Sequence, residues 1–257
     1  MSVVIFSNQK GGVGKTTLTR ELGIYAAGSS RRILLVDCDP QGNLTKSLTD
    51  KESPGLYESF IEGKVFLNQI SENLSLFTGN YRLAALEKSL IGEIDCYTRL
   101  RDLLKGDQFS EFEHIFLDTP PSLGVLTVNA LTASEHIVIP MNPSLYSMQG
   151  TNDLLVTINK VRRNLNPNLT LLGVIINAYD SRPVITRQIK DEIRGEFGGK
   201  VFATVLSRTI KIEESIAEKE GVIFHRRLDK SRIKEEITAI GDELLERLGA
   251  AYAVRPS

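Results

Sequence analysis

The chain has 257 residues, of which 41% are hydrophobic and 25% charged, and its formal net charge is −1. This length suits one globular α/β domain, and no run of ~20 apolar residues predicts a membrane span. The first residues lack the basic flank and apolar stretch of a signal peptide and predict a strand instead. Two cysteines, Cys38 and Cys96, are too few for a disulfide framework or a cysteine metal cage, so we expect reduced thiols.

Short apolar runs rich in β-branched residues alternate with helical patterns along the chain. The predicted strands cover residues 3–7, 32–37, 74–78, 114–118, 136–140 and 171–177, with a weaker candidate at 200–205. The predicted helices cover residues 16–27, 122–133, 145–163, 184–197 and 232–248, and segment 41–73 is the least regular. Continuous apolar strands are typical of sheets buried on both faces. We therefore predict an α/β fold, a mostly parallel twisted sheet of about seven or eight strands flanked by helices on both faces.

The strongest local signal is the segment QKGGVGKTT, residues 9–17, which follows the first predicted strand and opens a helix. Its glycines allow a tight turn whose N–H groups point at phosphate oxygens, and the helix N-terminus adds partial positive charge. Lys15 is placed to bind the β- and γ-phosphates, Thr16 to give its hydroxyl to Mg²⁺, and Thr17 to contact the α-phosphate. The predicted nucleotide-binding residues of this loop are Gly11, Gly12, Val13, Gly14, Lys15, Thr16 and Thr17.

Two further motifs follow predicted buried strands. VDCDPQGN, residues 36–43, puts Asp37 and Asp39 where open parallel sheets bind ligands, and buried carboxylates there are costly unless a metal or a water network uses them. LDTPPS, residues 117–122, puts Asp118 at a strand end, where it fits a Walker B carboxylate that binds Mg²⁺ directly or through water. The sequence thus predicts Thr16 and Asp118 as metal-binding residues.

The phosphate loop departs from the general pattern G-x-x-x-x-G-K-[ST], because Gln9 replaces the first glycine and Lys10 adds a second lysine. In this it resembles the deviant Walker A motif of the ParA/MinD superfamily, and nearly the whole chain is similar to ParA/Soj partition ATPases. The resemblance implies ATP and Mg²⁺ as cofactors and weak ATPase activity, with Lys10, Lys15 and Asp39 as catalytic residues. It implies that Lys10 reaches across an ATP-bound homodimer, where a cation donated in trans offsets the repulsion between two triphosphates. The resemblance assigns Asp39 to orienting the attacking water and Asp37 to the surroundings of Mg²⁺, so that the expected metal site comprises Thr16, Asp37 and Asp118.

The resemblance extends to residues 173–202, which are similar to the family's strand, Tyr-Asp turn and following helix. Because the phosphate loop begins so early, we expect a single ATPase domain over 1–257 without an N-terminal helix-turn-helix domain. This resembles the short ParA class, which leaves operator binding to a partner, so we expect a ParB-like centromere-binding activator. The expected location is cytoplasmic and nucleoid-associated.

The chain departs from the family near the adenine pocket, where Leu206-Ser207-Arg208 replaces a frequent Ile-Pro-Arg. Segment EESIAEKEG replaces a Ser-Glu-Ala-Pro run, and RLDKSRI, residues 227–233, lacks the Tyr and Pro of the family pattern. These changes leave the base contacts open, and we place Asn177 and Ser207 there. A guanine-reading Asn-Lys-x-Asp motif is missing, because Asn159-Lys160 is followed by Val-Arg, so adenine is favoured.

The charge is unevenly spread. Residues 182–234 hold thirteen Lys or Arg and eight Asp or Glu, an excess of +5, which leaves −6 for the rest. Such a basic region can bind a polyanion, and together with the resemblance it predicts that the ATP dimer binds non-specific duplex DNA during plasmid or chromosome partition. The candidate DNA-binding residues are Arg187, Lys190, Arg208, Lys211, Lys230, Arg232 and Lys234.

Three alternatives stand beside this reading. A MinD-like membrane switch would need a basic amphipathic C-terminal helix, but the polar face of 233–252 is acidic, so we predict no membrane association and expect its apolar stripe to pack in the core. The second is a metabolic P-loop enzyme, either an amide synthase or a nitrogenase-like reductase. The reductase would hold a metal cluster between two subunits with two cysteines from each, and Cys38 on a predicted buried strand suits this poorly. The third shares the mechanism but positions a carboxysome, flagellum or chemoreceptor.

Overall fold

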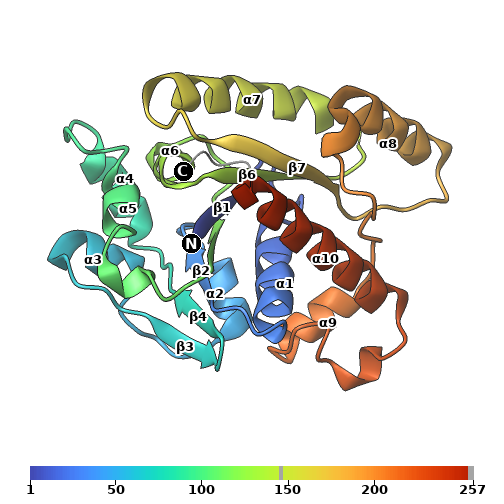
Figure 1. Ribbon diagram of the computed structural model, residues 1–257, viewed down its shortest axis with the longest axis horizontal. Coiled ribbons are helices and arrows are strands. Elements are labelled where there is room, and N and C mark those ends of the chain that lie inside the picture. Colours follow the sequence, from blue (N-terminus) through green and yellow to red (C-terminus); the bar gives the residue numbers. More distant parts are fainter. Residues whose placement is uncertain (145–146, 254–257) are drawn as a thin grey trace.

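A seven-stranded sheet lies between two layers of helices (Figure 1) in a computed structural model that describes residues 1–144 and 147–253. The strands are β1 (Ser2–Phe6), β2 (Ile33–Asp37), β3 (Asn68–Ser71), β4 (Leu74–Phe77), β5 (His114–Asp118), β6 (His136–Met141) and β7 (Thr170–Ile176). Their order across the sheet is β3-β4-β2-β5-β1-β6-β7, and only the β3–β4 pair is antiparallel. The predicted α/β fold with a mostly parallel sheet is confirmed.

The helices of the described residues connect these strands. They are α1 (Lys15–Gly28), α2 (Asn43–Leu48), α3 (Leu56–Glu62), α4 (Leu83–Leu90), α5 (Arg99–Leu103), α6 (Val125–Ala133), α7 (Ser147–Asn164), α8 (Val184–Phe197), α9 (Lys211–Ala217) and α10 (Arg232–Ala253). Short 3₁₀ turns occur at Asp107–Phe109, Gly198–Lys200 and Arg226–Leu228. Residues 145 and 146, where we expected a helix to begin, lie outside the described residues.

Each central strand contributes to two hydrophobic cores, one on each face of the sheet. In β1, Val3 and Ile5 pack with α4 to α8, whereas Val4 and Phe6 pack with α1, α2, α9 and α10. Successive side chains of a strand point to opposite faces, so a strand covered on both sides must be apolar at every position. This explains the uninterrupted apolar runs that identified these strands in the sequence.

Helix α10 packs against α1 on one face of the sheet (Figure 1). The residues of its apolar stripe are at most 4% exposed, and they are Ile233, Ile237, Ile240, Leu244 and Leu248. The prediction that this stripe packs in the core is confirmed. Within residues 1–144 and 147–253, no helix is both long and apolar enough to cross a membrane.

The strand predicted at 200–205 is wrong. This segment runs beside β7 but pairs with it only at isolated positions, such as Val201 with Val174. Backbone hydrogen bonds to β7 come only at intervals, from Phe202 N–H to the Val174 carbonyl at 2.9 Å and from Leu206 N–H to the Ile176 carbonyl at 2.8 Å. Between them, Ala203 N–H donates to Glu243 Oε2 at 2.9 Å, and Arg194 donates to the Ala203 carbonyl at 2.9 Å. The uneven spacing of the bonds to β7 breaks the regular ladder that a parallel strand requires.

Segment 41–73 is more regular than its sequence suggested. It holds α2, α3 and β3, a short strand at the edge of the sheet whose residues are only half-buried or exposed. The sequence NQIS of this strand is polar and short, so it lacks the β-branched run that marked the central strands. Position in the sheet, not propensity, makes this segment a strand.

A buried ion pair joins α1 to the chain after α9. Arg20 and Glu21 are in contact, and both side chains are 0% exposed. Arg20 Nη2 also donates to the Glu220 carbonyl at 3.1 Å, and Glu21 Oε2 accepts a hydrogen bond from Val222 N–H at 2.8 Å. The helix that follows the phosphate loop is therefore tied to residues 220–222 by charged groups with no access to water.

We expect Glu21→Ala to lower the free energy of unfolding by about 3–5 kcal/mol, because it leaves the Arg20 guanidinium buried without its counter-charge. Replacing both members, with Arg20→Met and Glu21→Leu, should recover most of that loss. Urea denaturation followed by circular dichroism measures both effects, with Glu62→Ala on an exposed site as the control. Equal unfolding midpoints for wild type and Glu21→Ala would show that the pair does not support this junction.

Candidate functional site

The three motif segments meet at the carboxyl edge of three adjacent strands. Strand β5 lies between β1 and β2, and Asp118 is in register with Phe6 on one side and Asp37 on the other. Because parallel strands end at the same edge, the phosphate loop after β1 faces the aspartate motifs after β2 and β5. The sequence-based expectation that the motifs share one edge of the sheet is confirmed.

The phosphate loop needs glycine at two positions because of the backbone conformation, and at one of them also because of the space available. Gly12 and Gly14 have φ values of 71° and 89°, in the left-handed region that other residues rarely adopt. A Cβ on Gly14 would also lie 2.0 Å from Nδ2 of Asn177. The loop therefore closes onto the end of β7 only because Gly14 has no side chain.

Three asparagines at strand ends hold the loop backbone. Asn177 Nδ2 donates to the Val13 carbonyl at 2.7 Å, and Asn142 Nδ2 donates to the Gly12 carbonyl at 3.0 Å. Asn8 Oδ1 accepts a hydrogen bond from Lys10 N–H at 3.0 Å. Asn177 was predicted from the sequence, whereas Asn8 and Asn142 were not. The signal that could have identified them was their position within two residues of the ends of β1 and β6, at the edge where the ligand was expected.

Lys15 lies across the inside of the loop. Its Nζ donates to the carbonyls of Asn8 at 3.0 Å and Lys10 at 3.2 Å, and the residue is 7% exposed. Burial lowers the pKa of Lys15, whereas the nearby carboxylates of Asp118 and Asp39 raise it. An ammonium fixed by two carbonyls beside two carboxylates can neutralise an anion that enters the loop.

Lys10 points to the side of the loop. Its Nζ donates to Ser144 Oγ at 2.7 Å, and the residue is half-buried. This contact holds the second lysine of the loop against the segment after β6 within a single chain.

Asp118 has one oxygen bonded and one oxygen free of hydrogen bonds. Thr16 Oγ1 donates to Asp118 Oδ2 at 2.7 Å, whereas Oδ1 is buried without a hydrogen-bond partner among residues 1–144 and 147–253. Burial, followed by the charge of Asp37, raises the pKa of Asp118 well above its usual range. A buried carboxylate oxygen without a donor, beside a threonine hydroxyl, fits a hard divalent cation such as Mg²⁺.

Asp37 is bonded by the turn that follows it. Its Oδ2 accepts hydrogen bonds from Thr45 N–H at 2.8 Å and Thr45 Oγ1 at 2.7 Å, and its Oδ1 accepts one from Asp39 N–H at 3.2 Å. Burial raises the pKa of Asp37, and the Thr45 hydrogen bonds partly offset that rise. Asp37 therefore organises the second motif from behind, while Thr45, which the sequence analysis missed, fixes its carboxylate.

Asp39 lies one turn further on and is 7% exposed. Its Oδ1 accepts a hydrogen bond from Gln41 N–H at 2.9 Å, which orients the carboxylate at the start of the turn. Gly42, with φ 63°, then lets the chain enter α2. The result is a carboxylate held at the same edge as Lys15 and Asp118.

Ser207 is bonded to α10. Its N–H and Oγ donate to the two carboxyl oxygens of Glu236 at 2.7 and 2.6 Å. No hydrogen bond joins Ser207 to the phosphate loop in the part of the chain that the structure describes. Of the two predicted base contacts, the structure thus brings Asn177 against the loop and ties Ser207 to Glu236.

Contacts through Tyr179 and Glu236 connect three basic residues of the C-terminal third. Lys190 Nζ lies 5.5 Å from the ring centre of Tyr179, whose carbonyl accepts a hydrogen bond from Arg208 N–H at 3.0 Å. Arg232 Nε donates at 2.7 Å to Glu236, the same carboxylate that holds Ser207. These contacts link the segments that carry Lys190, Arg208 and Arg232 to one another.

The same surface contains both paired and unpaired cations. Lys234 lies 2.5 Å from Asp229 and Lys190 lies 3.6 Å from Asp191, so part of their charge is compensated. Of the candidate DNA-binding residues, those that are exposed and have no ion pair to any described residue are Arg187, Arg208, Lys211 and Lys230. These four side chains are available to an anionic ligand without breaking an ion pair.

Comparison with known proteins gives matches over most of the chain. Residues 1–171 match the family described as AAA domain. The chain is 34% identical over 252 residues to the chromosome partitioning protein ParA of Myxococcus xanthus, covering 95% of this chain and 88% of that protein. It is 37% identical to the chromosome-partitioning ATPase Soj of Thermus thermophilus, covering 82% and 83% of the two chains.

A solved structure is similar over the same extent. It is described as cobyrinic acid a,c-diamide synthase from Mycobacterium smegmatis with bound ADP and magnesium. It is 30% identical to this chain, superposes with a TM-score of 0.82, and the match covers 97% of this chain and 96% of that one. The fold therefore extends over nearly the whole of both chains.

Proposed function

Because the chain belongs to the ParA/Soj family of partition ATPases, we propose that it is an ATP-dependent switch that dimerises and binds non-specific duplex DNA. The chain is an ATPase that uses ATP and Mg²⁺, as its family membership establishes. The observation that carries the proposal is the meeting of Lys15, Asp39 and Asp118 at one edge of the sheet, around a loop that closes on two positive-φ glycines.

In the proposed site, the loop binds the phosphates of ATP. Its backbone turns at Gly12 and Gly14 and leads into the positive end of α1, while Lys15 contributes a fixed ammonium. The side-chain amides of Asn142 and Asn177 donate hydrogen bonds to two loop carbonyls, which keeps those carbonyl oxygens from facing the anionic ligand. Binding thus requires little rearrangement of the protein.

Thr16 and Asp118 would hold Mg²⁺. The free oxygen of Asp118 and the hydroxyl of Thr16 lie together, whereas both oxygens of Asp37 already accept hydrogen bonds. Asp37 therefore supports the metal site through its neighbours. The bound cation supplies positive charge to the phosphate oxygens during transfer.

Asp39 is proposed to orient the attacking water. Its carboxylate is bonded at Oδ1 by Gln41 N–H, so it is fixed in direction while it can still accept a proton or hydrogen bond from water. Its charge also lies close enough to Lys15 to raise the pKa of that ammonium. Removing this carboxylate should affect turnover more than nucleotide binding.

Lys10 is proposed to act across a homodimer. In the single chain its ammonium is held by Ser144, a neutral partner that a facing phosphate could replace at small cost. Two facing triphosphates repel, and a lysine from each subunit would neutralise the other's phosphates. This makes dimerisation depend on the γ-phosphate.

DNA binding is proposed for the surface that holds Lys190, Arg208 and Arg232, with Arg187, Lys211, Lys230 and Lys234 around it. The few cations of one subunit would bind duplex DNA only weakly. A dimer doubles the number of contacts on one rigid body, so the affinity for DNA rises through effective concentration. A ParB-like centromere-binding protein is the proposed activator, plasmid or chromosome DNA the proposed cargo, and the nucleoid the proposed location. The resemblance leaves carboxysomes, flagella and chemoreceptors as other cargoes.

A second candidate function comes from the 30% identical structure described as cobyrinic acid a,c-diamide synthase. An amide synthase would couple ATP hydrolysis to its carboxylic substrate and an ammonia donor. The two functions differ in what stimulates ATP turnover: DNA and a partner protein in one case, cobyrinic acid with ammonia in the other. We favour partition, because curated relatives of 34% and 37% identity carry that activity in their names.

We expect Asp39→Ala to keep ATP affinity near that of wild type and to reduce hydrolysis to background. Lys15→Ala should instead weaken ATP binding itself, because it removes the ammonium that contacts the phosphates. Calorimetry with a non-hydrolysable ATP analogue and a phosphate-release assay separate the two effects. Wild-type turnover in Asp39→Ala would remove Asp39 from the catalytic residues.

ATP should convert monomers into dimers and ADP should leave monomers. In an Asp39→Ala background, which keeps ATP intact, Lys10→Ala should stay monomeric while still binding ATP. Light scattering gives the mass in each state, and Lys88→Ala on α4 serves as an exposed-lysine control. The same mass with ATP and ADP in the Asp39→Ala protein would refute the switch.

The ATP dimer should bind DNA of any sequence, with log K falling against log salt at a slope of roughly −0.9 for each phosphate neutralised. Arg208→Glu and Lys211→Glu should weaken binding to all sequences alike and flatten that slope by about one or more, with basal ATPase activity kept. Lys88→Glu is the matched control, since it reverses one exposed charge on α4, a helix without candidate DNA-binding residues. A gel shift absent at low salt, with Asp39→Ala and ATP, would contradict DNA binding.

A further inference from the structure

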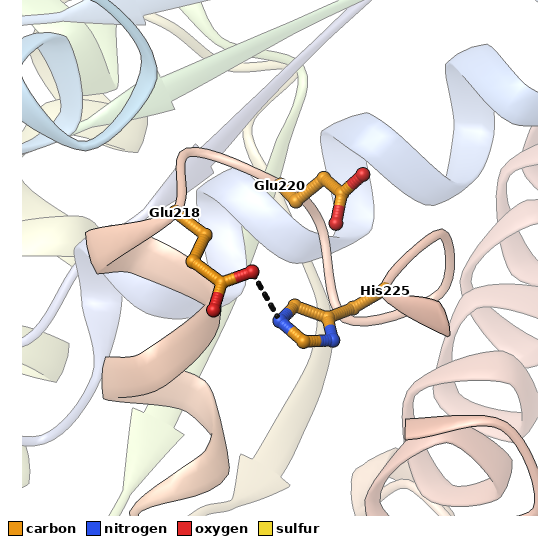
Figure 2. Close-up of side chains that lie close together, drawn as sticks. All are labelled: Glu218, Glu220 and His225. Carbon is orange, nitrogen blue, oxygen red and sulfur yellow. Dashed lines mark ion pairs between the residues drawn. The ribbon is translucent and has the colours of Figure 1, made fainter. Parts of the chain in front are cut away.

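Three side chains of types that bind metals converge after α9, away from the nucleotide edge. They are Glu218, Glu220 and His225, and one ligand atom from each lies within 4.8 Å of the other two. Figure 2 shows Glu218 and His225 pointing toward each other, with Glu220 beside them and a helix behind. The two carboxylates are exposed and the imidazole is buried, so the cluster has a closed side and an open side.

The His225 ring is short of partners. The residue is 3% exposed, and neither ring nitrogen has a hydrogen-bond partner within the described ranges. Nε2 lies 3.1 Å from Glu218 Oε2, but this contact lacks hydrogen-bond geometry. Buried polar atoms normally have partners, so a ring that faces a carboxylate without bonding it indicates a missing ligand.

The backbone holds these residues in place. His225 N–H donates to the Gly221 carbonyl at 3.1 Å, which closes a tight turn. The buried pair on α1 binds the same turn, because Arg20 donates to the Glu220 carbonyl and Glu21 accepts from Val222 N–H. The cluster is therefore built on a segment that charged groups fix to a long helix, and little ordering is needed for a ligand to bind.

One cation lies next to the cluster. Arg227 Nη1 is 3.1 Å from Glu218 Oε1, and its side chain is 81% exposed. This pair orients the Glu218 carboxylate so that the other oxygen, Oε2, faces His225. The cluster thus brings two carboxylates and one guanidinium next to the imidazole.

We propose that Glu218, Glu220 and His225 bind a divalent first-row transition metal, with Zn²⁺ as the best fit. One imidazole nitrogen and two carboxylate oxygens are three ligands of the kinds that zinc uses, and the exposed side leaves a fourth position for water. Mg²⁺ and Ca²⁺ fit less well, because they prefer six or more oxygen ligands to an imidazole. The metal would join the end of α9 to the turn at 221–225, and through it to α1.

Zinc titration of the untagged full-length protein, followed by calorimetry in excess Mg²⁺, tests this site. Wild type should bind one zinc ion that Glu218→Gln and Glu220→Gln each weaken about tenfold or more. Glu213→Gln, an exposed carboxylate on α9 outside the cluster, should bind as wild type does. Zinc should also raise the unfolding temperature of wild type and of Glu213→Gln, but not of the Glu218→Gln/Glu220→Gln double variant.

A crystal soaked in Zn²⁺ should show an anomalous peak among these three side chains. His225→Gln removes the nitrogen ligand, but His225 is buried, so the two surface glutamate variants keep the test valid if that protein fails to fold. Absence of stoichiometric zinc binding to wild type would overturn the proposal. So would equal affinity in wild type and the double variant, which would place the bound zinc elsewhere on the chain.

Discussion

Two carboxylates side by side at the ends of buried strands are the constraint on which the rest of this site depends. Asp37 and Asp118 are 0% exposed and in register on adjacent strands, so each raises the cost of charging the other. Like charges in a low-dielectric environment are tolerated only with compensating cations or donors. Asp37 is compensated by Thr45, whereas Asp118 has Thr16 and Lys15 nearby and one oxygen left over. The unbonded oxygen of Asp118 makes this edge suited to bind a cation.

The phosphate loop is connected to the basic surface through one short segment. Asn177 holds the loop at Val13, and two residues later Tyr179 contacts both Lys190 and the backbone of Arg208. On the other face, the Arg20–Glu21 pair fixes α1 to residues 220–222. The loop is therefore linked, through packed and hydrogen-bonded groups, to the surface that is proposed to bind DNA. This contiguity supports the proposed coupling between nucleotide state and DNA binding.

The sequence predicted the central sheet and the motifs that meet at its edge, because both depend on local patterns. Strands buried on two faces must be apolar throughout, and a phosphate loop needs its glycines and lysine in a fixed order, so both were visible in the chain. The parts that were missed depend on tertiary contacts. Thr45, Asn8 and Asn142 have no motif around them, and their roles arise because strand order brings them to one edge. The prediction of a strand at 200–205 failed because the bonds that Phe202 and Leu206 donate to β7 are too unevenly spaced for a continuous ladder, which no local pattern shows.

The central claim is that Asp118 and Thr16 hold the cation that makes ATP binding favourable at this edge. Calorimetry of an ATP analogue, with Mg²⁺ and with EDTA, tests it in wild type, Asp118→Asn and the exposed control Asp107→Asn. We predict that Mg²⁺ strengthens binding in wild type and in Asp107→Asn, and that Asp118→Asn loses most of this gain. An Asp118→Asn protein with the full Mg²⁺ dependence of wild type would contradict the account.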